Sequence, residues 1–135
     1  MNKATWKNFE IAAEYKGDKP APWTANGRQN WNYHRITVKN TENGLRTGFD
    51  FWASIARPHL ETEYDLLNAF YCFVSDALSG LETFEGFCAE FGYDTDSRPA
   101  KRTWKACKRS TEKLERIAGG ADLYDLCNEL SEVGA

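Results

Sequence analysis

The N-terminal part of the chain alternates apolar and polar residues with a period of two, which predicts β-strands. Apolar residues occupy every second position of 9–15, and the turn-forming residues 17–20 predict the end of that strand. A second strand is expected over 30–39 and a third over 46–53, with a glycine-containing turn at 40–44 between them. Three sequential strands with short connections predict an antiparallel meander with one buried face.

The same alternation assigns side chains to the two faces of the predicted sheet. Ile36 and Val38 share one parity and are expected to be buried. Phe49 and Phe51 are expected to lie on the same buried face. The outward aromatic residues are then Trp31, Tyr33 and Trp52. Aromatic residues on an open face anchor protein interfaces and stack on single-stranded bases. Alternatively, segment 20–30 covers these rings, or a second subunit of a homodimer does.

After Pro58 the apolar spacing changes to a helical one. Thr62, with Asp65 three residues later, resembles a capping box, and Gly80 and Gly92 are placed to end helices. We expect helices over 62–79, 83–91, about 97–118 and 123–132. The pattern predicts one α+β domain over residues 1–135: a three-stranded antiparallel sheet within 1–56, then a cluster of about four helices within 62–132.

Composition narrows the class of protein. The chain has 135 residues, of which 41% are hydrophobic and 14% aromatic, and this excludes a disordered chain. No stretch approaches the roughly 20 apolar residues of a membrane span, and the N-terminus lacks the apolar run of a secretory signal. We therefore expect a cytoplasmic protein without a membrane partner.

The chain offers few groups for catalysis or metal binding. The four cysteines form no C-x-x-C pair, and in a reducing cytosol they are expected to be small buried hydrophobic residues. A zinc site built with His34 or His59 is the alternative; we instead expect a structural His34 and a solvent-facing His59. No phosphate-binding, nucleophile-elbow or zinc-protease motif occurs. We therefore expect no enzyme activity, and we assign no catalytic, cofactor-binding or metal-binding residues.

Charge is sorted into blocks along the chain. Residues 61–96 contain nine acids and no Lys or Arg, whereas 98–116 contain eight basic residues and two acids. At about 100° per residue, the basic side chains fall on one face of the helix expected there. They are Arg98, Lys101, Arg102, Lys105, Lys108 and Arg109, followed by Lys113 and Arg116. The opposite face contains Ala100, Trp104, Cys107, Thr111, Leu114 and Ala118.

Three interpretations of the basic face stay open at this point. Its cations are solvated and pair with the acidic block, or they contact nucleic-acid phosphates, or they contact an acidic protein surface. The net charge of −3 is unlike the basic balance of a dedicated nucleic-acid binder. The acidic helices are either solvated faces or a mimic of nucleic-acid charge.

One run of residues resembles a recurring signature. The pattern F-C-x-E-F-G-Y-D-x-D-S-R spans Phe87–Arg98, and it continues through Lys101 and Trp104–Cys107. Together with Asp65–Ala69 and Phe49–Trp52, it resembles small uncharacterised proteins of bacteriophages and prophages over most of residues 30–131. Pro99 stands where that family is expected to have Lys or Thr. The family provides no chemistry that could be carried over to these residues.

The resemblance implies a biological context. Short, non-catalytic phage accessory proteins often act on host machinery. Anti-CRISPR proteins are of similar size and belong to this general class. The leading hypothesis is a phage accessory protein that binds and inhibits a host defence complex in the cytoplasm of an infected or lysogenic bacterium. The partner is then a host protein or nucleoprotein complex. The alternative is a nucleic-acid-binding factor in phage replication or recombination, and a hidden enzyme is the third hypothesis.

Overall fold

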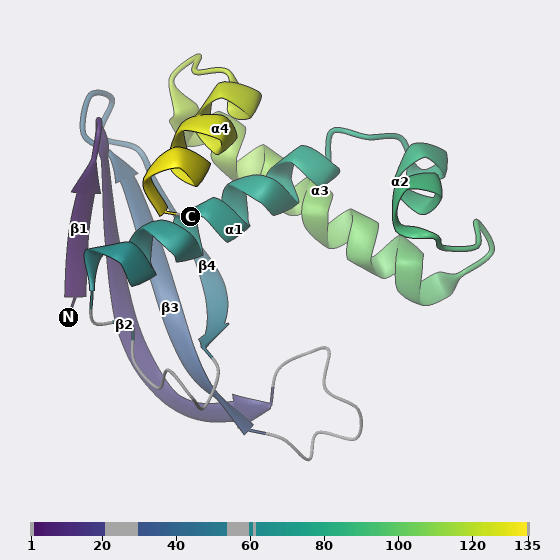
Figure 1. Ribbon diagram of the computed structural model, residues 1–135, viewed down its shortest axis with the longest axis horizontal. Coiled ribbons are helices and arrows are strands. Elements are labelled where there is room, and N and C mark those ends of the chain that lie inside the picture. Colours follow the sequence, from purple (N-terminus) through teal and green to yellow (C-terminus); the bar gives the residue numbers. More distant parts are fainter. Residues whose placement is uncertain (1, 21–29, 54–59, 61, 135) are drawn as a thin grey trace. The chain divides into compact units, whose positions relative to one another are not determined.

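A computed structural model describes residues 2–20, 30–53, 60 and 62–134 of the chain (Figure 1). The elements are β1 (Asn2–Trp6), β2 (Phe9–Pro20), β3 (Asn30–Asn40), β4 (Arg46–Ala53), α1 (Glu63–Ser79), α2 (Phe84–Phe91), α3 (Arg98–Ala118) and α4 (Leu123–Gly134). The expected α+β class with four helices is confirmed. The chain divides into two compact units inside α1: a sheet unit, Met1–Phe70 with Gly134, and a helical unit, Tyr71–Val133 with Ala135.

The sheet has four antiparallel strands in the order β1-β2-β3-β4, so the expectation of three was wrong. The strand that sequence reasoning missed is β1, which pairs with β2 from Asn2↔Ala13 to Trp6↔Phe9. It is only five residues long, and its two-residue turn lacks the glycine that usually identifies a tight hairpin. Lys7 instead adopts the positive φ of 52° in this turn.

Strand β2 continues to Pro20, so the prediction that it ends near Gly17 was also wrong. The register moves from Tyr15↔His34 to Gly17↔Tyr33, which places a bulge between the two pairs. Gly17 has φ of 103°, a conformation that other residues rarely adopt. The turn-forming residues therefore bend the strand without ending it.

The buried face of the sheet follows the predicted parity. Ile36 and Val38 have no exposed surface, and Phe49 is 8% exposed, whereas Phe51 is only half-buried. Within this unit, the start of α1 contributes Phe70, whose ring centroid is 5.4 Å from that of Phe9. The core of the sheet unit is thus formed by one sheet face and the first half of α1.

His34 is buried in the sheet unit, which is compatible with the structural role predicted for it. Its side chain is 2% exposed, its Nδ1 is 3.1 Å from the carbonyl oxygen of Asn32, and the ring of Tyr15 is 5.3 Å away. His59 lies outside the described residues. Among the described residues, no group of three His, Cys, Asp or Glu side chains is placed to hold a metal ion.

Side-chain caps define the predicted helix ends. Thr62 Oγ1 accepts from the Asp65 amide at 3.1 Å, and Asp65 Oδ2 accepts from the Thr62 amide at 3.2 Å, which completes the capping box. Thr83 caps α2 and Ser97 caps α3 in the same way, by accepting from an amide three residues later. Gly92 then ends α2 in the left-handed conformation.

The helical unit is held together by the apolar face of α3. Leu114 and Ile117 have no exposed surface, and the Thr111 hydroxyl donates to the Ala77 carbonyl at 2.6 Å. Gly80, just after α1, faces this contact: a methyl group there would overlap Thr111 Oγ1 and the Cys107 carbonyl. The C-terminal part of α1 therefore approaches α3 closely because position 80 has no side chain.

The cysteines only partly match the expectation of buried hydrophobic residues. Cys88 and Cys107 are buried, but Cys72 is exposed and Cys127 is intermediate. Burial and the nearby charge of Asp76 raise the pKa of the Cys107 thiol to about 11.

In the part of the chain that is described, no helix is long and apolar enough to cross a bilayer.

Candidate functional site

The basic residues predicted to share one face of α3 do so. We call Arg98, Lys101, Arg102, Lys105, Lys108 and Arg109 the cationic face, and all six are exposed. The helix exists because Ser97 caps its start, Pro99 suits its first turn, and its opposite side is buried. The helix contains eight basic residues and two acids, so its net charge is +6. Because the whole chain has a net charge of −3, the residues outside this helix carry −9.

Most of the basic side chains of α3 have no ion-pair partner in the described part of the chain. Among the described residues, Arg98, Lys101, Arg102, Lys105 and Arg109 form no ion pair. The interpretation that these cations pair with the acidic block therefore has no support in the described part of the chain. Five side chains over about 16 Å of helix are available to an external anionic group.

The charges in the first turn of α3 oppose the helix dipole, whereas Arg116 in the last turn agrees with it. Its first turn contains no acid, and Arg98 and Lys101 lie at the end where the dipole is positive. A cation at that end costs about 0.3–1 kcal/mol. A sequence selected only for the stability of this helix would place acids there, so the arrangement favours a role in recognition.

Lys108 differs from the other members of the cationic face. Its Nζ lies 4.8 Å from the centroid of the Trp104 ring and 3.5 Å from the Gly80 carbonyl oxygen. Trp104 in turn donates from Nε1 to the Glu82 carbonyl at 3.1 Å and packs on Phe84 at 5.4 Å. Lys108 thus helps to hold α3 against the segment after α1, and Trp104 is already engaged by neighbours within the chain.

The three aromatic residues predicted to point outward from the sheet lie on the same face. Trp52 is opposite Tyr33 across β3 and β4, with ring centroids 5.1 Å apart, and Trp31 is opposite Lys19. The Lys19 Nζ is 4.7 Å from the Tyr33 ring. Trp31, Tyr33 and Trp52 are all half-buried, so they offer less surface than open aromatic rings would. Most of the segment proposed to cover them, 21–29, lies outside the described residues.

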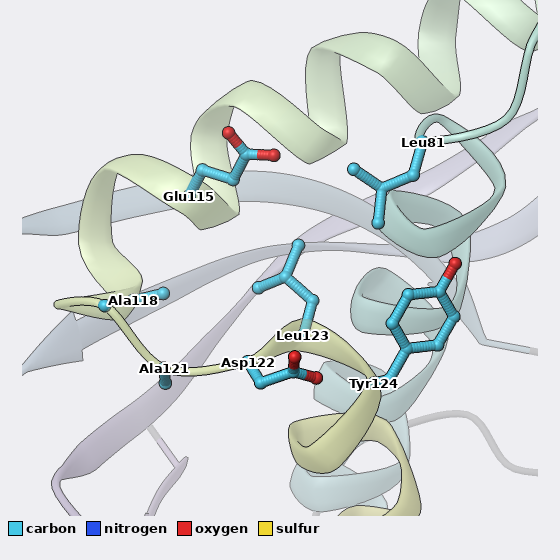
Figure 2. A pocket seen from close by; sticks show the side chains of 8 residues that line it. Leu81, Glu115, Ala118, Ala121, Asp122, Leu123 and Tyr124 are labelled. Carbon is cyan, nitrogen blue, oxygen red and sulfur yellow. The ribbon is translucent and has the colours of Figure 1, made fainter.

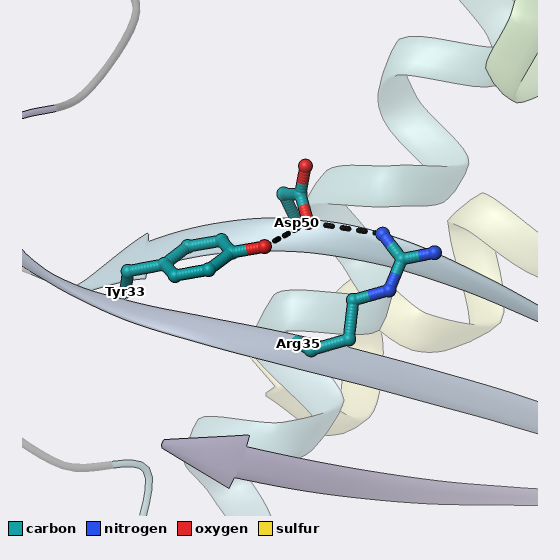
Figure 3. A network of polar contacts seen from close by, with 3 residues as sticks. All are labelled: Tyr33, Arg35 and Asp50. Carbon is teal, nitrogen blue, oxygen red and sulfur yellow. Dashed lines mark hydrogen bonds and ion pairs between the residues drawn. The ribbon is translucent and has the colours of Figure 1, made fainter. Parts of the chain in front are cut away.

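Beside these rings is a polar network that sequence reasoning did not identify (Figure 3). Asp50 Oδ1 accepts from the Tyr33 hydroxyl at 2.6 Å and from Arg35 Nη1 at 2.9 Å. Gly48 leaves room for the guanidinium, since a methyl group there would lie 2.8 Å from an Arg35 nitrogen. The sequence signal that could have indicated this network is the pair of opposite charges at Arg35 and Asp50. Both residues occupy outward-facing positions of the predicted strands, and they are direct partners across β3 and β4.

The network shifts the pKa values of its members. Partial burial alone would raise the pKa of Asp50, but hydrogen bonds from Tyr33 and Arg35 and the guanidinium charge together lower it. The hydrogen bond to Asp50, with some burial, raises the pKa of Tyr33. Both groups therefore keep their ordinary charge states at neutral pH, and the network is a fixed structural feature.

The predicted site residues thus form two sets, one on α3 in the helical unit and one on the sheet unit. The first set is exposed and forms no ion pairs with the residues that the structure describes. The second set is half-buried and internally connected. Comparison with protein-family models, curated proteins and solved structures finds no match.

Proposed function

We propose that this protein is a non-catalytic accessory protein of a phage or prophage that binds and inhibits a host defence complex through the cationic face of α3. The observation that carries the proposal is a set of exposed cations that form no ion pair with any described residue: Arg98, Lys101, Arg102, Lys105 and Arg109. Binding through these cations therefore breaks no ion pair within residues 2–20, 30–53 and 62–134. The phage context is proposed from the resemblance of most of residues 30–131, above all the run 84–107, to small phage and prophage proteins.

Charge of this kind acts mainly on recognition and on the rate of encounter. A surface with a concentrated charge steers a partner of opposite charge, and the effect declines within a Debye length of about 8 Å at physiological salt. The partner surface is therefore expected to be acidic, or to expose nucleic acid, at the point of contact.

The test is a titration of the purified protein into purified host nuclease complexes, with complex formation and target cleavage both measured. We expect a stable complex and reduced cleavage, and we expect Lys105→Glu with Arg109→Glu to abolish both. The matched control is Lys113→Glu with Arg116→Glu, which makes the same change in net charge near the C-terminal end of α3. There, Glu112 and Glu115 already lower the local positive charge. The absence of any complex, together with undiminished cleavage, would refute the proposal.

Direct binding to nucleic acid is the second candidate, and the same unpaired cations favour it. If five cations each contact a phosphate of duplex DNA, the slope of log affinity against log salt should be about −4.5. Lys105→Glu should make that slope shallower by about 0.9. Unchanged DNA mobility in gels at low salt would remove this candidate without affecting the first.

A further inference from the structure

The helical unit contains a pocket away from the cationic face, at the junction of α3 and α4. Its volume is about 330 Å³, within the range of small-ligand pockets. The lining residues are Leu81, Glu115, Ala118, Gly120, Ala121, Asp122, Leu123 and Tyr124. Figure 2 shows the side chains of Leu81, Leu123 and Tyr124 around one shared space, with Glu115 reaching it from α3.

The apolar part of this pocket is incompletely covered. Leu123 and Ala118 are buried at its base, but Leu81 is 44% exposed and Tyr124 is 51% exposed. Burial of apolar surface gains roughly 25 cal/mol per Å², so an apolar group seated between Leu81 and Tyr124 would be stabilised. Tyr124 lies in the first turn of α4, which Asp122 caps by accepting from the Asp125 amide at 3.0 Å through Oδ1.

The charged part of the pocket is entirely acidic. The lining includes the carboxylates of Glu115 and Asp122 and no basic side chain. Asp122 is engaged as a helix cap, whereas Glu115 forms no ion pair among the described residues. An apolar ligand with a negative charge is therefore disfavoured, and one with a positive charge is complementary.

We propose that this pocket binds an organic cation with an apolar body, of which an arylalkyl ammonium is the simplest example. The apolar body packs between Leu81, Leu123 and Tyr124, and the ammonium lies beside the Glu115 carboxylate. This site has the opposite charge preference to the cationic face of α3, and the proposal does not depend on the function proposed above.

The test is an NMR titration of the full chain with phenethylammonium, and with 3-phenylpropionate as the ligand of similar size and opposite charge. We expect phenethylammonium to shift the resonances of Leu81, Leu123 and Tyr124 at millimolar concentration, and 3-phenylpropionate to have a much smaller effect. Glu115→Gln should weaken phenethylammonium binding about threefold, the size expected for an exposed ion pair.

Glu112→Gln is the matched control, because Glu112 is exposed on the same helix and does not line the pocket. It should leave phenethylammonium binding unchanged. Equal shifts with both ligands, no shift at these residues, or equal effects of the two substitutions would overturn the proposal. Because both glutamates are exposed, neither substitution is expected to prevent folding.

Discussion

Replacement of Gly80 by alanine tests the closest packing contact in the helical unit. The added methyl group would overlap Thr111 Oγ1 and the Cys107 carbonyl, and the second of these belongs to the backbone of α3. A rotation of the Thr111 side chain therefore cannot remove the overlap. The helix itself must move, and this would weaken the 2.6 Å hydrogen bond from Thr111 to Ala77.

The expected magnitude follows from three effects. Overpacking of a close contact costs about 1–3 kcal/mol. Weakening of the hydrogen bond to Ala77 adds about 1 kcal/mol. A change from glycine to alanine recovers about 0.4–1 kcal/mol by restricting the unfolded chain. The free energy of unfolding of Gly80→Ala should therefore be about 2 kcal/mol lower than that of the wild type.

Urea unfolding, followed by the circular dichroism of the helices, measures this difference. The midpoint should fall by about 1 M, given the usual dependence of stability on urea for a small protein. Gly86→Ala in α2 is the matched control: its methyl group would lie 3.2 Å from the side-chain ends of Glu82 and Thr83 and meets no backbone. That control should be neutral or slightly stabilising. An equal effect of the two substitutions would refute the reasoning about the α1–α3 contact.

The remaining predictions concern the cysteines, the Asp50 network and one helix cap. At neutral pH a thiol reagent should modify exposed Cys72 first and spare Cys107, whose pKa burial raises to about 11; equal rates would contradict the described burial. The pKa of Asp50 is lower in the folded protein than in the unfolded chain. Its contribution to the free energy of unfolding is therefore fully present above the unfolded pKa of about 3.9, and it is lost as the pH falls through the folded pKa. Asp50→Asn should therefore lower the free energy of unfolding at pH 7 by less than about 1 kcal/mol, and a deficit that persists in strong acid would argue against this linkage. Ser97→Ala should cost about 1 kcal/mol in urea unfolding, since it removes the acceptor for the Ala100 amide, and an unchanged midpoint would mean that this cap is not formed in solution.

The helices and the second and third predicted strands could be derived from the sequence because local signals agree there. In α2, for example, Thr83 supplies the cap, Phe87 and Cys88 are buried, and Gly92 ends the helix. Each signal is contained within a few residues, so no knowledge of distant contacts is required.

The missed features depend on partners that are distant in sequence or on unusual turn chemistry. Strand β1 has two buried side chains, Ala4 and Trp6, and a turn in which Lys7 takes the place usually occupied by glycine or asparagine. The extension of β2 past Gly17 depends on pairing with β3, which outweighs the turn tendency of that segment. The pocket joins Leu81 to residues more than thirty positions later, so no local pattern indicates it.

The distribution of charge also bears on which partner the cationic face is suited to. The +6 of α3 is set against −9 in the rest of the chain. A long polyanion such as duplex DNA extends beyond the roughly 16 Å contact of the cationic face, so only part of its charge can meet these cations. A compact acidic patch on a protein can match the length of the cationic face, so all of its charge can be attracted to these cations. The salt dependence separates the two cases: counterion release from DNA gives the steep slope of about −4.5, whereas a compact patch of a few carboxylates gives a shallower one. An acidic protein surface therefore ranks above free nucleic acid as the expected partner, and a steep slope with DNA would reverse the order.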